Sequence, residues 1–282
     1  MNNNIFNNLT KDIKSCLNHN KKDYYVHEPI EIEKSKKDVM KCIQSTNVST
    51  SGLYLEKFTN EIKKITGSKY VLLTNTGTSA LFISLKQFNI QNTEVLLPSM
   101  TFVATTNVIK YLDGIPHFID CEKLYPTIDI DKLERYLSTN CQIKNNKCIN
   151  KKTRKQIKTL IAVHAFGYPV DMYKLKKLCS KFYIDIIEDG AGALGTFICD
   201  KHVGTFSNYG ILSFNGNKIV TTGMGGAILI KNKKDYIDLY HLINVAKIQH
   251  SWKLEHNDIG YNFKMANINA SLGLNQIKNI KK

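Results

Sequence analysis

The sequence has 282 residues, of which 43% are hydrophobic, and a formal net charge of +15. This length and composition predict one large domain, or one domain and part of another, and exclude a membrane-spanning helix, because no apolar run approaches the roughly 20 residues required. The charge favours an anionic ligand, and the amino terminus lacks the apolar stretch of a signal peptide, so we expect a soluble, cytoplasmic protein without a membrane partner.

The cysteines and the most basic segment exclude two further classes of protein. Seven cysteines are scattered without a Cys-x-x-Cys pair, which argues against a disulfide framework and against a zinc site. Residues 144–158 hold seven Lys or Arg and no acid. Because no aromatic residue is interleaved for base stacking, we interpret this segment as a solvated loop. A nucleic-acid-binding protein is an alternative that rests on charge alone and implies steep salt dependence.

The apolar periodicity predicts the helices and strands in chain order. Helices are expected at 5–18, 31–44 and 53–65, with an extended lead at 25–29. From residue 69 onward, short apolar runs alternate with helical patterns. Strands are expected at 70–73, 94–97, 116–119, 159–163, 184–187, 210–214 and 226–231, and further helices at 80–85, 102–111 and 171–181.

This alternation predicts an α/β fold with a mostly parallel central sheet that is covered by helices on both faces. Ligands of such sheets bind at the carboxyl ends of the strands. The loops that follow strands are therefore the places to look for functional residues.

The first such loop, Thr74 to Leu81, joins a strand to a helix. Its small and hydroxyl-bearing residues, which include Gly77 and Thr78, are typical of a helix amino terminus that binds phosphate through free N–H groups. It is not a Walker loop, because no Gly-Lys-Ser/Thr follows. An N-cap without a ligand is the alternative interpretation.

The second and third loops contain an aromatic residue and two acids. Phe102, in the loop from Pro98 to Thr105, could stack on a planar cofactor or could belong to the core. Glu188 and Asp189 follow a buried strand, where a carboxylate needs a partner. A cationic ring nitrogen is one possible partner, and a pair of helix-cap acids is the alternative.

The fourth loop contains Lys218, which lies between the apolar pairs Ser213-Phe214 and Ile219-Val220 and is followed by Thr221-Thr222-Gly223. A lysine amine that is held still in suitable surroundings is a nucleophile towards aldehydes. Together the phosphate cradle, the aromatic ring, the acid and the lysine compose a pyridoxal phosphate site. The acid would keep the ring nitrogen protonated and the lysine would form the Schiff base.

From His27-Glu28-Pro29 to its end, the sequence resembles the DegT/StrS-type nucleotide-sugar aminotransferases. The segments Ser213 to Gly223, Val163 to Asp171 and His256 to Phe263 are most similar to the 4-aminotransferases of the bacillosamine and legionaminic acid pathways. The resemblance implies the type-I aminotransferase fold and pyridoxal 5'-phosphate as cofactor. It also implies amination of a UDP-linked 4-keto-6-deoxy-N-acetylhexosamine, with glutamate as donor.

The resemblance also assigns roles to individual residues and implies a homodimer with shared active sites. Lys218 would be the Schiff-base lysine and Asp189 the partner of the pyridinium nitrogen, while Phe102 would stack on the ring. Asn262 would reach the phosphate of the neighbouring subunit's cofactor. The phosphate in the chain's own site would be bound by Gly77, Thr78 and Ser213.

We expect an N-terminal helix and extended lead at 1–26 and a PLP-binding large domain at 27–282, with the small C-terminal domain of the family absent or truncated. Three residues depart from the family pattern. Gly192 stands where the family has a longer side chain, Lys264 stands where Arg is usual, and Met224 replaces a typical Glu or Gly.

Two other functions remain compatible with the sequence. A PLP-dependent sugar dehydratase is one, although relatives of that kind carry His in place of the Schiff-base lysine, so Lys218 argues against it. A truncated, non-catalytic member that binds a nucleotide-sugar or a partner is the other. The missing C-terminal domain and Gly192 favour that function, and the intact Asp189 and Lys218 pair argues against it.

Overall fold

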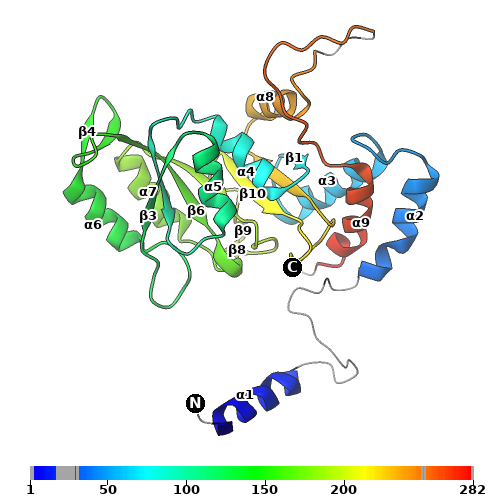
Figure 1. Ribbon diagram of the computed structural model, residues 1–282, viewed down its shortest axis with the longest axis horizontal. Helices are drawn as coiled ribbons and strands as arrows, with labels where there is room; N and C mark the ends of the chain where they lie inside the picture. The colour runs from blue at the N-terminus through cyan, green and yellow to red at the C-terminus, as the bar shows by residue number, and fades with distance from the viewer. Residues whose placement is uncertain (1–2, 17–28, 30–31, 249, 251, 281–282) are drawn as a thin grey trace.

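The computed structural model describes residues 3–16, 29, 32–248, 250 and 252–280, and Figure 1 shows their arrangement. A mixed sheet forms the centre of the molecule. Its main path runs in the order β1 (Tyr70–Thr74), β11 (Gly226–Ile230), β10 (Tyr209–Ser213), β7 (Asp185–Asp189), β6 (Gln156–Val163), β2 (Glu94–Pro98) and β3 (Ile115–Ile119).

Neighbouring strands from β10 to β3 pair in parallel, and β11 pairs antiparallel with both β10 and β1. The mostly parallel sheet is therefore confirmed. Two short strands, β8 (Phe197–Ile198) and β9 (Lys201–His202), form a separate antiparallel pair.

Helices cover both faces of the sheet (Figure 1). In chain order, the helices of the described residues are α1 (Asn3–Cys16), η1 (Ile32–Ser35), α2 (Lys36–Gln44), α3 (Leu53–Thr66), α4 (Gly77–Lys86), α5 (Val103–Tyr111), α6 (Ile130–Asn140), η2 (Ala165–Gly167), α7 (Met172–Lys181), α8 (Lys233–Ile243) and α9 (Asn267–Lys278), of which η1 and η2 are short 3-10 helices.

The side chains of each strand alternate between two cores, because successive residues of a strand point to opposite faces. Leu72 of β1 packs with α4, α5 and α8, whereas Val71 and Leu73 pack with α3 and α9. Further along the sheet, Leu160 of β6 packs with α6 and α7. Burial on both faces explains why these strands read as continuous apolar runs.

The predicted strands from residue 70 onward are confirmed to within a few residues, but the interpretation of the basic segment is wrong. Residues 144–158 are not a loop: they include the hairpin of β4 (Cys141–Lys144) and β5 (Lys147–Asn150) and the start of β6. Asn145 and Asn146 turn the chain with φ of 49° and 57°, the positive pair that a type I′ hairpin turn requires. Cys148 is fully buried, and this burial anchors a hairpin whose lysines are exposed.

Other expectations differ at the ends of elements. The helix expected at 31–44 divides into η1 and α2, and the strand expected at 184–187 extends to Asp189. Helices α6 and α8 were not expected from the sequence. The extended lead at 25–29, apart from Pro29, and the proposed boundary at 26/27 lie outside the described residues. Within the described ranges, no helix combines the length and the apolar character that crossing a membrane requires.

Candidate active site

The carboxyl ends of β1, β10, β7, β6 and β2 lie along one edge of the sheet, and strand pairing brings two predicted loops together there. Thr74 pairs with Gly226, and Gly226 pairs with Ser213, so the ends of β1 and β10 lie on either side of the start of β11. Two rows inward from Ser213, Asp189 of β7 lies between Ile211 and Val163.

The first loop forms the amino terminus of α4, as predicted. The Thr76 side chain caps the helix by accepting the Ser79 N–H at 2.9 Å. The N–H groups of Gly77 and Thr78 find no acceptor in the described part of the chain, so they remain available to an anion. Ser213 lies directly beside them, since a Cβ on Gly77 would be 2.9 Å from the Ser213 Cβ and 3.1 Å from its Oγ.

Asp189 is buried, and two donors fix its carboxylate. The Thr105 hydroxyl donates to Oδ2 at 2.8 Å, and the Ala191 N–H donates to Oδ1 at 3.1 Å. Thr105 lies one turn after Phe102 at the start of α5, where the Thr105 N–H donates to the Phe102 carbonyl. The phenyl ring of Phe102 is 76% exposed, so the core alternative for this residue is wrong.

Glu188, the other acid of the third loop, has a different role. Its buried carboxylate lies on the opposite face of the strand from Asp189 and accepts the N–H groups of Gly204, Phe206 and Ser207 at 2.7–2.8 Å. It also lies 3.3 Å from His164 Nε2. Burial acts to raise the pKa of Glu188, but the hydrogen bonds from His164, Gly204 and Ser207 outweigh it and hold the pKa below its usual value.

Lys218 lies in the loop between β10 and β11. Backbone bonds close the base of this loop, from Phe214 N–H to Gly225 O and from Thr222 N–H to Phe214 O, both at 2.9 Å. The lysine is half-buried, and its ammonium group has no hydrogen-bond or ion-pair partner among the described residues. Its side chain is therefore not engaged elsewhere in the described chain.

Asn262 lies beside the first loop of its own chain. Its carbonyl accepts the Asn75 side-chain amide at 3.4 Å, and the next residue, Phe263, accepts the Asn75 N–H at 2.8 Å. The Asn262 side chain is exposed. Two residues on, the Lys264 amine lies 5.4 Å from the centre of the Tyr240 ring.

The edge fits pyridoxal phosphate on three observations. The α4 terminus presents two free N–H groups beside the Ser213 hydroxyl. Asn75 Oδ1 and Thr101 Oγ1, in the loops after β1 and β2, are buried and lack a partner in the described chain, as expected of polar atoms that face a ligand site. The buried carboxylate of Asp189 is fixed by only two donors. No group of three metal-ligating side chains occurs among the residues described.

Sequence reasoning missed Thr105 and Phe166. Thr105 could have been recognised because it follows Phe102 by three residues, one helical turn. Phe166 is 82% exposed and has a φ of 52° in the short turn after β6, at the same edge of the sheet. The sequence gives no sign of this left-handed conformation. A side chain at Gly192 would meet no clash at its Cβ, since the nearest atom would be the Phe166 N at 3.9 Å, an ordinary van der Waals contact.

Comparison with known proteins identifies similar chains. The chain is 32% identical over 254 residues to GDP-perosamine synthase of Escherichia coli O157:H7. The matched region covers 90% of this chain and 65% of that protein. It is 29% identical to UDP-4-amino-4,6-dideoxy-N-acetyl-beta-L-altrosamine transaminase of Campylobacter jejuni, over 91% of this chain and 64% of that protein. The chain thus spans about two thirds of the length of the curated relatives that it matches.

Solved structures share the fold. PseC of Helicobacter pylori, an aminotransferase of pseudoaminic acid biosynthesis, superposes with a TM-score of 0.79 at 25% identity, over 91% of this chain and 66% of that one. The putative sugar aminotransferase Spr1654 of Streptococcus pneumoniae superposes in its PMP-form with a TM-score of 0.79 at 22% identity, over the same shares. The model of the DegT/DnrJ/EryC1/StrS aminotransferase family matches residues 29–282. The chain belongs to this family.

Proposed function

We propose that the protein is a PLP-dependent aminotransferase that acts on a nucleotide-linked keto sugar. The observation that carries the proposal is the convergence of the free α4 terminus, Ser213 and the fixed carboxylate of Asp189 at one sheet edge, next to the loop of Lys218. Family membership supports it.

The residues would hold the cofactor at its two ends. The N–H groups of Gly77 and Thr78 and the Ser213 hydroxyl would bind the phosphate, aided by the dipole of α4. The Asp189 carboxylate would hold a proton on the ring nitrogen, and the exposed ring of Phe102 would stack on the cofactor. Bound in this way, pyridoxal phosphate supplies an electron sink and carries the amino group between donor and acceptor.

Lys218 would be the residue that anchors the cofactor and moves protons. Its amine would take a proton from the donor's Cα and return one at C4 of the sugar. A lysine at this position also favours an aminotransferase over a sugar dehydratase. Asp189 and Lys218 together favour catalysis over a purely binding function.

For the substrate, we propose a UDP-linked 4-keto-6-deoxy-N-acetylhexosamine, with glutamate as donor. Similarity to the Campylobacter transaminase supports the UDP-linked sugar. Similarity to GDP-perosamine synthase favours a GDP-linked sugar as the second candidate. Parallel assays with UDP- and GDP-linked 4-keto-6-deoxy sugars separate the two.

Cofactor attachment tests the proposal directly. After incubation with pyridoxal phosphate and borohydride reduction, peptide mapping is expected to find the pyridoxyl group on Lys218. The Lys218→Ala protein is the control and should remain unlabelled at this peptide while retaining its fold. Labelling of a different lysine, or of none in folded protein, would contradict the proposal.

A further inference from the structure

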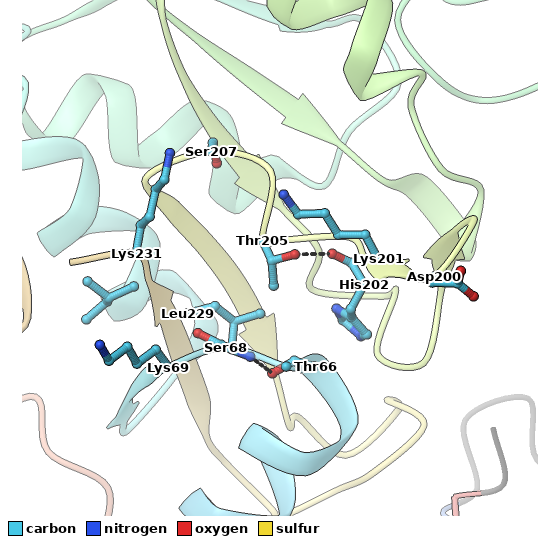
Figure 2. Close-up of a pocket in the computed structure, with 13 residues that line it drawn as sticks. Thr66, Ser68, Lys69, Asp200, Lys201, His202, Thr205, Ser207, Leu229 and Lys231 are labelled. Carbon is cyan, nitrogen blue, oxygen red and sulfur yellow. Dashed lines mark hydrogen bonds between the residues drawn. The ribbon is translucent and has the colours of Figure 1, made fainter.

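A cavity of about 360 Å³ lies at the opposite edge of the sheet from the candidate active site. Its walls come from the chain before β1, the chain before β10 and the chain after β11 (Figure 2). These segments are the amino ends of β1 and β10, so the cavity is separated from the Asp189 edge by the length of the strands. Its volume lies in the lower part of the range of small-molecule sites.

Three lysines line the cavity, namely Lys69, Lys201 and Lys231. None of them is paired with a carboxylate among the described residues. Asp200 is the acid of the lining, and Figure 2 shows its carboxylate pointing away from the Lys201 amine. The cavity therefore carries an excess of positive charge.

A fourth lysine extends this charge. The Lys176 amine donates to the Phe206 carbonyl at 2.8 Å, beside the wall of the cavity. Burial lowers the pKa of Lys176, and the charges of Lys231 and Lys201 lower it further, against an opposing effect of the Glu188 carboxylate behind the wall. These ammonium groups therefore repel one another, and an anion between them would remove the repulsion.

The other polar groups of the lining are already engaged. The hydroxyls of Thr66, Ser68 and Thr205 donate to the carbonyls of Ile62, Tyr70 and His202. Ser207 donates to Glu188 or Tyr209. Burial lowers the pKa of His202 to about 4, so this side chain is neutral near pH 7. The lysine ammonium groups, each with three N–H donors, are the free donors that a ligand would meet.

The wall of the cavity is rigid where it meets the sheet. Glu188 holds the segment 204–207 through the N–H groups of Gly204, Phe206 and Ser207. The Lys201 amine lies 4.5 Å from the centre of the Phe206 ring, which positions it at this wall. The lining contains no Phe, Tyr or Trp that could stack on a base.

From these observations we propose that this cavity is a second ligand site, which binds a small, multiply charged phosphate. Separate lysine point charges suit the several oxygens of a phosphate chain, whereas the bidentate recognition typical of a carboxylate uses Arg, which the lining lacks. The phosphate is either an inorganic chain or the phosphate group of a metabolite.

Calorimetric titration of the full chain with inorganic diphosphate tests the site. The protein is first loaded with pyridoxal phosphate, so that the phosphate-binding terminus of α4 is occupied, and free cofactor is removed before the titration so that it does not compete for the cavity. We expect saturable binding by the wild type and a loss of affinity of about tenfold or more in the double variant Lys201→Gln and Lys231→Gln, which keeps the side-chain stems. The matched control is Lys144→Gln with Lys147→Gln, which removes the same charge from the exposed hairpin, and it should change affinity less than about twofold.

Two further titrations identify the source of the phosphate. Equal affinity for diphosphate and UDP means that the phosphate alone is recognised, and tighter binding of UDP that is lost in the pocket variant means a nucleotide ligand. The proposal is overturned if the wild type shows no saturable binding, if both double variants weaken it equally, or if citrate binds more tightly than diphosphate. Thermal unfolding of each variant checks that the fold is retained.

Discussion

Glu188 and Asp189 are neighbours in the sequence but serve different purposes, because successive side chains of a strand point to opposite faces. Glu188 accepts three backbone N–H groups and holds the segment 204–207 in place. Asp189 is held by Thr105 and Ala191 at the edge where we propose that the cofactor binds. One carboxylate holds a segment of the fold in place, and we propose that the other serves the cofactor site.

Substitution separates these two roles. We expect Asp189→Asn to retain its melting temperature and bind pyridoxal phosphate, but to lose the half-reaction with glutamate by about 100-fold or more, since an amide does not hold the proton on the ring nitrogen. Glu188→Gln should instead lower the free energy of unfolding by about 2 kcal/mol or more, because hydrogen bonds to a buried charge are lost. Denaturant titration measures the free energy of unfolding of each variant, and absorbance at the cofactor band follows the half-reaction with glutamate. A near-normal half-reaction in Asp189→Asn would show that Asp189 has another role.

At the scale of elements, helix α9 supports the loop that carries Lys218. The buried side chain of Gln276 accepts the Thr221 N–H at 3.0 Å and donates to the Thr221 carbonyl at 2.9 Å. Asn269 of the same helix donates to the Thr222 carbonyl at 2.7 Å. The position of Lys218 therefore depends on a helix that begins 49 residues further along the chain.

Removal of this support should affect both stability and cofactor attachment. Gln276→Ala leaves the Thr221 N–H and carbonyl without partners, and each buried unpaired group costs about 1–3 kcal/mol. We expect a destabilisation of about 2 kcal/mol or more in denaturant titration, and slower labelling of Lys218 by pyridoxal phosphate and borohydride. Lys278→Ala, an exposed position in the last turn of α9, is the matched control. Unchanged labelling in Gln276→Ala would mean that the loop holds its shape without the helix.

At the scale of the whole molecule, the resemblance to the family places Asn262 in the cofactor site of a second copy. The described chain is compatible with this placement, since the Asn262 side chain is exposed beside the loop before α4. We propose a homodimer in which each subunit completes the phosphate site of the other.

Mixing two inactive variants tests the shared site. If Lys218→Ala and Asn262→Ala subunits exchange at random, half of the dimers are heterodimers with one intact site each, so about a quarter of wild-type activity should return. Each variant assayed alone is the control. Failure of the mixture to exceed either parent, or full activity in a stable monomer, contradicts the shared site.

The sequence by itself determined the strands and the loops that follow them. Runs such as Val71 to Leu73 are apolar because both faces of the sheet are covered, and this local pattern is sufficient to predict a strand. The same holds for the loops: Gly77, Asp189 and Ser213 each lie at the carboxyl end of a predicted strand. The exposure of Phe102 and the hairpin formed by residues 141–150 were not determined in this way, because burial and strand pairing depend on neighbours outside the local pattern.

Only the tertiary structure decided which strands are neighbours. The antiparallel insertion of β11 between β1 and β10 brings Thr74, Gly226 and Ser213 into one row, although Thr74 and Ser213 are 139 positions apart in the sequence. Apolar periodicity states that a segment is a strand, but pairing depends on long-range hydrogen bonds and packing that no local pattern contains. The same reason explains why the lysine-lined cavity was not foreseen: Lys69, Lys201 and Lys231 become neighbours only when β1, β10 and β11 pair.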